Sequence, residues 1–312
     1  MREQVLPKAL RLIPIICLIA LVNACARPVK QACVNEKVHP LTQQIMVDIK
    51  YLSSDVMAGR AVGSPGSKLA RNYIITRFKS LGISPFQSDY SHVFHHNKLN
   101  RRKGTNIVAQ IQGTHFPEKH IVISAHYDHL GQKYGQIFHG ADDNASGVAL
   151  MLALAQWLMD NPPQYTIVFL ASDAEEQGLL GAKSFLANTK QRILANVNID
   201  MVGRARRNYF VSSSELKQPL KAAIVGKEQC ITYRRLHNMP HGRGKIDYLR
   251  ASDHFAFAKA QIPFVFISGP IHDDYHLPSD RVNRIKENDI SLAFNNVRLL
   301  YRHMLKALTE VK

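Results

Sequence analysis

Cysteines are scarce in this chain, and internal repeats and low-complexity tracts are absent from it. Four cysteines occur among 312 residues. Cys17 and Cys25 lie in the N-terminal segment considered below, which leaves Cys33 and Cys230, and two lone cysteines do not make a zinc site. An oxidising compartment would permit a disulfide between them, a question that the sequence leaves open. The absence of repeats excludes a repeat architecture.

Acidic residues are few relative to basic ones. The chain has 40 Lys and Arg residues against 24 Asp and Glu residues, a formal net charge of +16. Such a surplus is typical of nucleic-acid-binding proteins, but here the basic residues are dispersed, with the tightest clusters at residues 101–103 and 204–207. No aromatic-rich RNA-binding motif accompanies them. We therefore expect no nucleic-acid partner, and instead a cationic surface that faces an anionic envelope or an acidic substrate.

An apolar run near the N-terminus, residues 12–22, is too short to span a membrane comfortably. It follows three basic residues and has the length of a signal-peptide core. The run leads into the sequence LVNAC, in which a small residue precedes Cys25, and this resembles the bacterial lipoprotein box. The resemblance implies cleavage before Cys25 and lipidation of that residue.

The domain organisation follows from this segment. We expect a lipoprotein-type signal peptide over residues 1–24, a lipid-anchored tether over residues 25–38 and a single domain over residues 39–312. Acyl chains on Cys25 would hold the protein to a membrane, on the periplasmic face of the bacterial envelope. The alternative is simple secretion with a cut after Ala24 or Ala26.

Helical and strand patterns alternate through the rest of the chain. This alternation predicts an α/β three-layer sandwich with a mostly parallel, mixed central sheet flanked by helices. The continuous apolar run at residues 165–172 is typical of a central strand that is covered on both faces. Helices are predicted at residues 41–52, 68–81, 147–159, 180–188, 215–226, 253–260 and 288–309, and strands at 106–113, 120–126, 165–172, 195–200 and 263–268.

Five polar segments lie just past a strand end or at the start of a helix. In open α/β sheets ligands bind beyond the carboxyl ends of the strands, so we expect these segments to converge. Imidazole and carboxylate groups together suit zinc, and a carboxylate can bridge two metals. The segments contain His126 with Asp128, Asp142 to Asn144, Glu175 with Glu176, Asp200, and His276.

Two further roles follow from spacing. A hydrolytic metal site needs one carboxylate free of metal to take the proton from water, and the adjacent pair Glu175 and Glu176 can divide the tasks of base and ligand. Asp128 lies two residues beyond His126, on the same side of a strand, and can orient the imidazole.

Each segment also has an ordinary structural interpretation. Asp142, Asp143 and Asn144 are good helix caps, paired glutamates favour helix starts, and an aspartate after a strand often forms a turn. Taken singly these interpretations are adequate. Five unrelated structural roles that all fall at one predicted sheet edge are less probable than a single site to which the five segments contribute.

The motifs SAHYDH, GADDNASG, DAEEQGLLGAKSF, NIDMVG and YHLPSD resemble those of the co-catalytic di-zinc aminopeptidases, the bacterial leucyl-aminopeptidase type of metallopeptidase family 28. They occur in the family's order, and the resemblance covers roughly residue 52 to the C-terminus. The resemblance implies a zinc-peptidase-like fold and two zinc ions per chain. It also implies hydrolysis of the N-terminal residue of peptides.

The resemblance assigns a role to each site residue. His126 and His276 each bind one zinc, Asp143 bridges both, and Glu176 and Asp200 complete the metal ligands, one on each ion. Glu175 is the general base, Asp128 orients His126, and Tyr275 stabilises the oxyanion. In the family the peptide bond after the bridging aspartate is cis, which points to Asp143 followed by Asn144, and leaves Asp142 as a loop or cap residue.

Rival functions remain open. A glutaminyl cyclase shares the fold but uses one zinc and lacks a complete second ligand set. Carboxypeptidase specificity is another minority interpretation, and a lipoprotein that binds peptides without catalysis is the alternative outside the enzymes. We expect a monomer that acts on peptides, with a lining for the first side chain from the region of residues 233–248.

Overall fold

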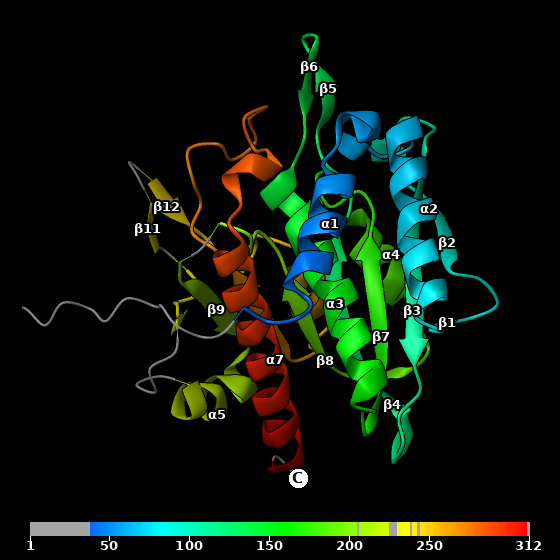
Figure 1. The fold of residues 1–312 in the computed structure, drawn as a ribbon. Coiled ribbons are helices and arrows are strands. Elements are labelled where there is room, and N and C mark those ends of the chain that lie inside the picture. Colours follow the sequence, from blue (N-terminus) through cyan, green and yellow to red (C-terminus); the bar gives the residue numbers. More distant parts are fainter. Residues whose placement is uncertain (1–37, 205, 225–229, 238, 242–243, 311–312) are drawn as a thin grey trace, which may run out of the picture. The chain divides into compact units, whose positions relative to one another are not determined.

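Among the described residues, nine strands form one mixed β-sheet at the centre of the domain (Figure 1). The computed structural model describes residues 38–310 apart from 205, 225–229, 238 and 242–243. The strand order is β1-β3-β7-β4-β8-β13-β9-β10, with β2 paired to β3. The strands are β1 (Ser84–Pro85), β2 (Ser91–His95), β3 (Lys103–Ile111), β4 (Phe116–His126), β7 (Tyr165–Ser172), β8 (Arg192–Ile199), β9 (Asn208–Ser212), β10 (Ile231–Tyr233) and β13 (Phe264–Ser268).

The four central strands β7, β4, β8 and β13 are parallel to one another. Strand β3 pairs antiparallel with β7, and β9 pairs antiparallel with β13. The expected mostly parallel, mixed sheet is therefore confirmed. Strands β2 and β9 were not predicted from the sequence. In β2 only Phe94 is buried, so the strand has no alternating apolar pattern.

Helices cover both faces of this sheet (Figure 1). Helices α1, α2, α3, α5 and α7 contribute to the larger apolar cluster on one face. Helices α4 and α6 contribute to a smaller cluster on the other face. The helices are α1 (Thr42–Leu52), α2 (Pro65–Ser80), α3 (Gly147–Asp160), α4 (Leu180–Asn188), α5 (Ser214–Ile224), α6 (His254–Lys259) and α7 (Glu287–Glu310).

Strand β7 shows why the sequence produces this layering. All eight of its residues are buried, and successive side chains of a strand point to opposite faces. Ile167 and Phe169 join the larger apolar cluster, and Val168 and Leu170 join the smaller one. A continuous apolar run is therefore required here, as the sequence analysis inferred.

Two hairpins lie outside the central sheet. Strands β5 (Gly131–Lys133) and β6 (Gln136–Phe138) form one that projects beyond the neighbouring elements (Figure 1). Strands β11 (Met239–His241) and β12 (Gly244–Ile246) form the other, in the region expected to line the substrate pocket. The β5–β6 hairpin leads into the segment Ala141–Ser146, which precedes α3.

Several expectations for the N-terminal part lie outside the described residues. They are the signal peptide, lipidation of Cys25 and the tether as far as residue 37. Cys230 takes part in a disulfide, and the other three cysteines of the chain lie outside the described residues. None of the helices in the described part of the chain combines the length and the apolar character needed to cross a bilayer.

Candidate metal centre

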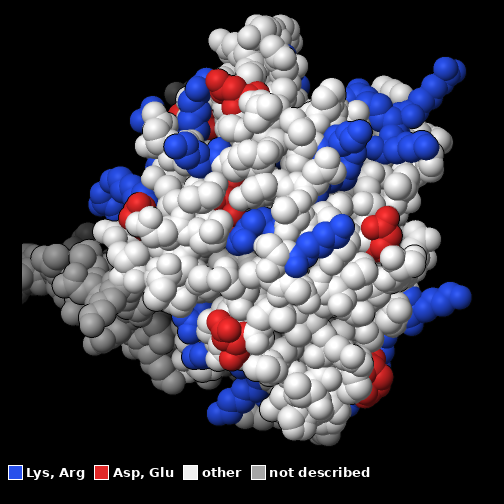
Figure 2. All heavy atoms as spheres, turned by 45° about the vertical axis from the view of Figure 1, so that its right-hand side comes forward, with Lys and Arg blue, Asp and Glu red and all other residues white. Residues whose placement is uncertain are grey.

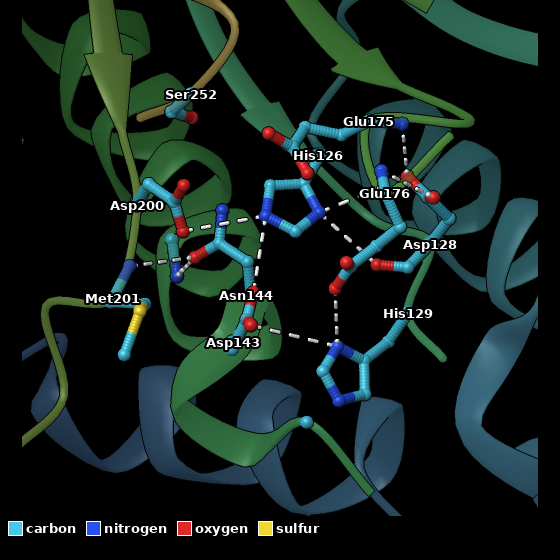
Figure 3. A network of polar contacts seen from close by, with 12 residues as sticks. His126, Asp128, His129, Asp143, Asn144, Glu175, Glu176, Asp200, Met201 and Ser252 are labelled. Atoms are coloured by element: carbon cyan, nitrogen blue, oxygen red, sulfur yellow. Dashed lines mark hydrogen bonds and ion pairs between the residues drawn. The ribbon is translucent and has the colours of Figure 1, made fainter. Parts of the chain in front are cut away.

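One group of donor atoms comes from the ends of β4 and β8 and from the turn before α3. His126 Nε2 lies 3.3 Å from Asp143 Oδ1 and 3.3 Å from Asp200 Oδ1. All three side chains are buried. Figure 3 shows the two carboxylates turned toward the same edge of the imidazole ring. His126 is the last residue of β4 and Asp200 directly follows β8, as the convergence of parallel strand ends requires.

A second group lies on the other side of Asp143. His276 Nε2 is 3.1 Å from Asp143 Oδ2 and 3.4 Å from Glu176 Oε1. His129 Nδ1 is 3.0 Å from the same Glu176 oxygen and 3.8 Å from Asp143 Oδ2. The two oxygens of Asp143 therefore face different groups, and this is the arrangement of a carboxylate that bridges two cations.

The backbone around Asp143 is held by neighbouring side chains. The peptide bond between Asp143 and Asn144 is cis, as the resemblance implied. The Asn144 amide donates to the Ile199 carbonyl and accepts from the Met201 N–H, which ties this turn to the end of β8. The Asp280 carboxylate accepts the N–H groups of Asp142 and Asp143, each at 3.1 Å.

Asp142 points away from both donor groups. Its carboxylate accepts the Gly203 N–H at 2.6 Å, the Ser146 hydroxyl at 3.1 Å, and lies 3.1 Å from His272 Nε2. These contacts fix the turn and do not reach Asp200 or Glu176. The structure thus separates the two adjacent aspartates as the sequence analysis did.

The two glutamates after β7 occupy different surroundings. Figure 3 shows the Glu175 side chain extending toward His126, while the Glu176 carboxylate faces His129. Burial raises the pKa of Glu175 well above its ordinary value, and the carboxylates of Asp253 and Asp200 add to this effect. Glu176 therefore lies among the candidate metal-donor atoms, and Glu175 has the environment of a proton acceptor.

Asp128 contacts His126 mainly through its backbone. The Asp128 carbonyl oxygen lies 3.1 Å from His126 Nδ1, whereas the nearest carboxylate oxygen lies 3.8 Å from it. The carboxylate instead accepts the backbone N–H groups of Glu175 and Glu176. Asp128 therefore links His126 at the end of β4 to the loop that carries both glutamates.

Tyr275 stacks on the neighbouring His276, with ring centroids 3.9 Å apart and an angle of 25° between the rings. Its side chain is 37% exposed, so one side of the ring is open to solvent at the edge of the site. Burial and the nearby carboxylates of Asp143 and Asp200 raise the pKa of its hydroxyl. The group therefore remains a neutral hydrogen-bond donor.

The electrostatic balance of the two groups fits bound cations. Burial would raise the pKa of Asp143, but His129, His126 and His276 outweigh it and hold that pKa well below its ordinary value. Several buried donor atoms have no hydrogen-bond partner among the described residues: both ring nitrogens of His129, Glu176 Oε1 and Asp200 Oδ1. Buried polar atoms are seldom left unpaired, and a metal ion in each group would satisfy His129 Nδ1, Glu176 Oε1 and Asp200 Oδ1.

The donor set suits zinc. Donors about 2.0–2.1 Å from a tetrahedral zinc ion lie about 3.3 Å from one another, and the nitrogen–oxygen distances in the two groups range from 3.0 to 3.8 Å. Within each group of His126, Asp143 and Asp200, and of His129, Asp143 and Glu176, all donor atoms lie within 4.8 Å of one another. Mixed imidazole and carboxylate ligands are those that zinc takes in hydrolytic sites.

A buried arginine supports this end of the sheet. Arg60 is fully buried and donates to the carbonyl oxygens of Tyr127 at 2.7 Å, His139 at 2.7 Å and Gly140 at 2.9 Å. A fourth bond joins it to Leu52. Burial lowers its pKa to about 10, so it stays charged at neutral pH and offsets part of the negative charge of the carboxylates.

The structure brings together all eight site residues predicted from the sequence, and it adds three that the prediction lacked. His129 stands three residues after His126 within the motif SAHYDH, and its position just past a strand end was the signal for it. Asp280 ends the motif YHLPSD. Arg60 lies in the segment Asp55–Arg60, where the sequence shows breaker residues and no chemical pattern.

Comparisons with known proteins agree on the family. The sequence matches "Peptidase family M28" over residues 106–300. It is 29% identical over 203 residues to the alkaline phosphatase isozyme conversion protein of Escherichia coli, covering 58% of this chain and 57% of that protein. It is 39% identical over 108 residues to a probable zinc metalloprotease of Pyrenophora tritici-repentis, covering 33% of this chain and 25% of that protein. The chain thus spans little more than half of the first relative and a quarter of the second.

Solved structures share the fold. A zinc aminopeptidase from Bacillus subtilis superposes with a TM-score of 0.66 at 16% identity, over 86% of this chain and 96% of that one. A glutaminyl cyclase from an Acidobacteriales bacterium has the same TM-score at 20% identity, over 89% of this chain and 98% of that one. With the family match covering the strands that carry the donor groups, the chain belongs to peptidase family M28, a family of zinc metallopeptidases.

Proposed function

We propose that this protein is a zinc-dependent aminopeptidase that removes the N-terminal residue of peptides. One observation carries the proposal: Asp143 directs its two carboxylate oxygens to two separate donor groups, each with a histidine and a further carboxylate. A site that binds a single metal does not require this second set. The name of the Bacillus subtilis relative as a zinc aminopeptidase supports the same activity.

The residues of the chain divide the reaction between them. Zinc ions held by the donor groups would supply Lewis acidity, which lowers the pKa of water and polarises the scissile carbonyl. Glu175 accepts a proton from the attacking water and delivers it to the leaving amine. The Tyr275 hydroxyl donates a hydrogen bond to the developing oxyanion. Asp128 holds the loop that positions Glu175.

Carboxylates also explain a preference for a free N-terminus. Glu175, Glu176 and Asp200 surround the site, and a positively charged α-amino group is attracted to such a concentration of negative charge. We propose an apolar lining for the first side chain, from residues of the region 233–248.

Hydrolysis of a panel of aminoacyl reporter substrates, with and without a chelator, tests the proposal. The Glu175→Gln variant should lose turnover while keeping its metal content. Glu118→Gln changes an exposed glutamate on β4 in the same way and should keep full turnover. Full activity in Glu175→Gln, or no hydrolysis of any substrate by the zinc-loaded wild type, would contradict the mechanism.

A glutaminyl cyclase is the second candidate, because cyclases are among the structures with the same fold. The two enzymes differ in metal content and in product. An aminopeptidase contains two zinc ions per chain and releases a free amino acid. A cyclase contains one and converts an N-terminal glutamine to pyroglutamate with release of ammonia. Metal analysis and mass spectrometry of a glutamine-initiated peptide separate them.

The location at the bacterial envelope is also a proposal, which rests on the sequence before Cys25. We expect Cys25→Ser to abolish incorporation of radiolabelled palmitate and to move the protein from the membrane fraction to the soluble fraction. The dispersed Lys and Arg side chains in Figure 2, with few acidic groups between them, suit a surface that faces anionic lipid or other anionic envelope components.

A further inference from the structure

His129 is a fully buried histidine without a hydrogen-bond partner for either ring nitrogen within the described residues. Leaving a buried polar group unpaired costs free energy, about 1–3 kcal/mol for a neutral group. The ring does not point into the apolar core: its Nδ1 faces Glu176 Oε1 and Asp143 Oδ2 (Figure 3). A histidine held in this way is either a hydrogen-bond donor to Glu176 or a ligand for the ion that Glu176 binds.

The distances distinguish these two roles in part. A hydrogen bond to Glu176 alone would account for the 3.0 Å contact. Such a hydrogen bond does not explain why Nδ1 also lies near Asp143. The donor atoms of His129, Asp143 and Glu176 all lie within 4.8 Å of one another. His276 Nε2 approaches the same two oxygens, at 3.1 and 3.4 Å. The rings of His129 and His276 have centroids 5.9 Å apart, so neither occupies the place of the other.

The neighbouring backbone leaves room for this ring position. Gly140 has φ of 56°, and a Cβ atom on it would lie 2.6 Å from the His129 ring and 2.1 Å from the Asp143 carbonyl oxygen. Any larger residue at position 140 would displace the imidazole. Arg60 also donates a hydrogen bond to the Gly140 carbonyl oxygen. Backbone packing beside Gly140 therefore confines the ring, in addition to the contact of Nδ1 with Glu176.

We propose that His129 is a metal ligand, which gives the second donor group four protein ligands: His129, His276, Asp143 and Glu176. The first group then has three, from His126, Asp143 and Asp200. Zinc sites with four protein ligands are closed, whereas those with three keep a position for water or substrate. The two ions are thus unequal: the second is bound more tightly, and the first is the one open to the reactants. The inference rests on the proposed binding of two zinc ions.

Cobalt substitution counts the histidine ligands directly. In a Co²⁺-loaded protein, each bound imidazole carries an N–H proton whose NMR signal is shifted strongly by the paramagnetic ion and disappears in D₂O. We expect three such signals in the full-length wild type and two in His129→Phe. Two signals in the wild type would overturn the assignment, and this measurement does not depend on the folding of any variant.

Competition with a zinc chelator provides an independent test. The wild type should release its two zinc ions at different chelator concentrations. His129→Phe should weaken the tighter site by more than about 100-fold, which is beyond the range for residues that only contact a ligand. A smaller loss would contradict the proposal and indicate that His129 is only a hydrogen-bond partner of Glu176. His120→Phe, six residues before His126 in β4, removes another buried histidine and should leave both affinities unchanged.

Peptidase assays separate this inference from the proposed function. A wild type that binds two metal ions with three histidine signals, but hydrolyses no aminoacyl substrate, would contradict the function and uphold the role of His129. An active wild type with two signals would do the reverse.

Discussion

The Asp128 carboxylate accepts the backbone N–H groups of Glu175 at 3.0 Å and of Glu176 at 3.4 Å. Asp128 follows β4 and the glutamates follow β7, so this contact joins the ends of two neighbouring parallel strands. It places Glu175 and Glu176, the proposed base and the proposed metal ligand, relative to His126, and it requires two acceptor oxygens on one side chain.

Replacing Asp128 by Asn should disturb both glutamates. Asparagine keeps the shape but has one acceptor oxygen, so its NH₂ group faces one of the two N–H groups. We expect kcat/KM to fall about 10–100-fold, as for other residues that position a metal ligand. Asp89→Asn is a matched control, because Asp89 also accepts a backbone N–H, in a loop that contributes no donor to the site. Unchanged kinetics in Asp128→Asn would show that the loop holds its position without this carboxylate.

Replacing Arg60 by Met should destabilise the fold strongly. The change leaves four buried carbonyl oxygens without their donor, and each such loss costs about 1–3 kcal/mol. We expect the free energy of unfolding, measured with urea, to fall by at least about 3 kcal/mol. Arg250→Met removes an arginine whose side chain is 71% exposed and should change stability by less than about 0.5 kcal/mol.

Two glycines of the β5–β6 region allow a test of close packing at the metal centre. Gly140 and Gly135 both have positive φ, so alanine strains either backbone by about 1–2 kcal/mol. Only at Gly140 would the new Cβ meet His129 and Asp143, since nothing lies within 4 Å of one at Gly135. We expect Gly140→Ala to lower zinc affinity and Gly135→Ala to keep it. Equal zinc titration curves for the two variants would contradict the packing argument.

His254 predicts a loss of stability in acid. It stacks on Phe266, with centroids 4.2 Å apart, and its Nε2 donates to the Tyr248 carbonyl. Burial lowers its pKa to about 3 from an ordinary 6.5. In that interval the unfolded chain binds the proton and the folded chain does not, so stability falls as the pH drops below 6.5, by about 2 kcal/mol at pH 5.

The variant His254→Phe isolates this effect. It keeps the aromatic stack, loses one hydrogen bond and removes the titrating group. We expect it to be less stable than the wild type at pH 7.5, and the difference to shrink or reverse at pH 5. Parallel urea midpoints for the two proteins across this range would exclude His254 as the cause.

The sequence sufficed for the layers and for most of the site because both follow from short patterns. The buried run at β7 predicts a central strand, and polar residues at strand ends predict where ligands meet. Helix and strand bounds agree closely, with β7 and α4 matching to the residue. The cis bond after Asp143 was available only through the resemblance to a family.

Other features depend on contacts between distant segments, which no local pattern contains. Arg60 binds carbonyl groups up to 80 residues away, and a lone arginine among glycines has no periodicity to reveal it. The position of His129 depends on Gly140, which lies across the β5–β6 hairpin. The primary contact of Asp128 is with the backbone of Glu175, and the sequence spacing pointed only to His126.

The candidate metal donors come from residues as far apart as His126 and His276, which lie at or after the ends of strands β4, β7, β8 and β13 and in the turn before α3. No short stretch of the polypeptide therefore contains the donors of both groups. His276 emerges from the ribosome last of all, after the whole parallel core of the sheet. A chain truncated before residue 276 would lack one donor of the second group, whereas the donors of the first group, His126, Asp143 and Asp200, would all be present. The first group of donors is therefore complete once Asp200 has been made, and the second group only once His276 has been made.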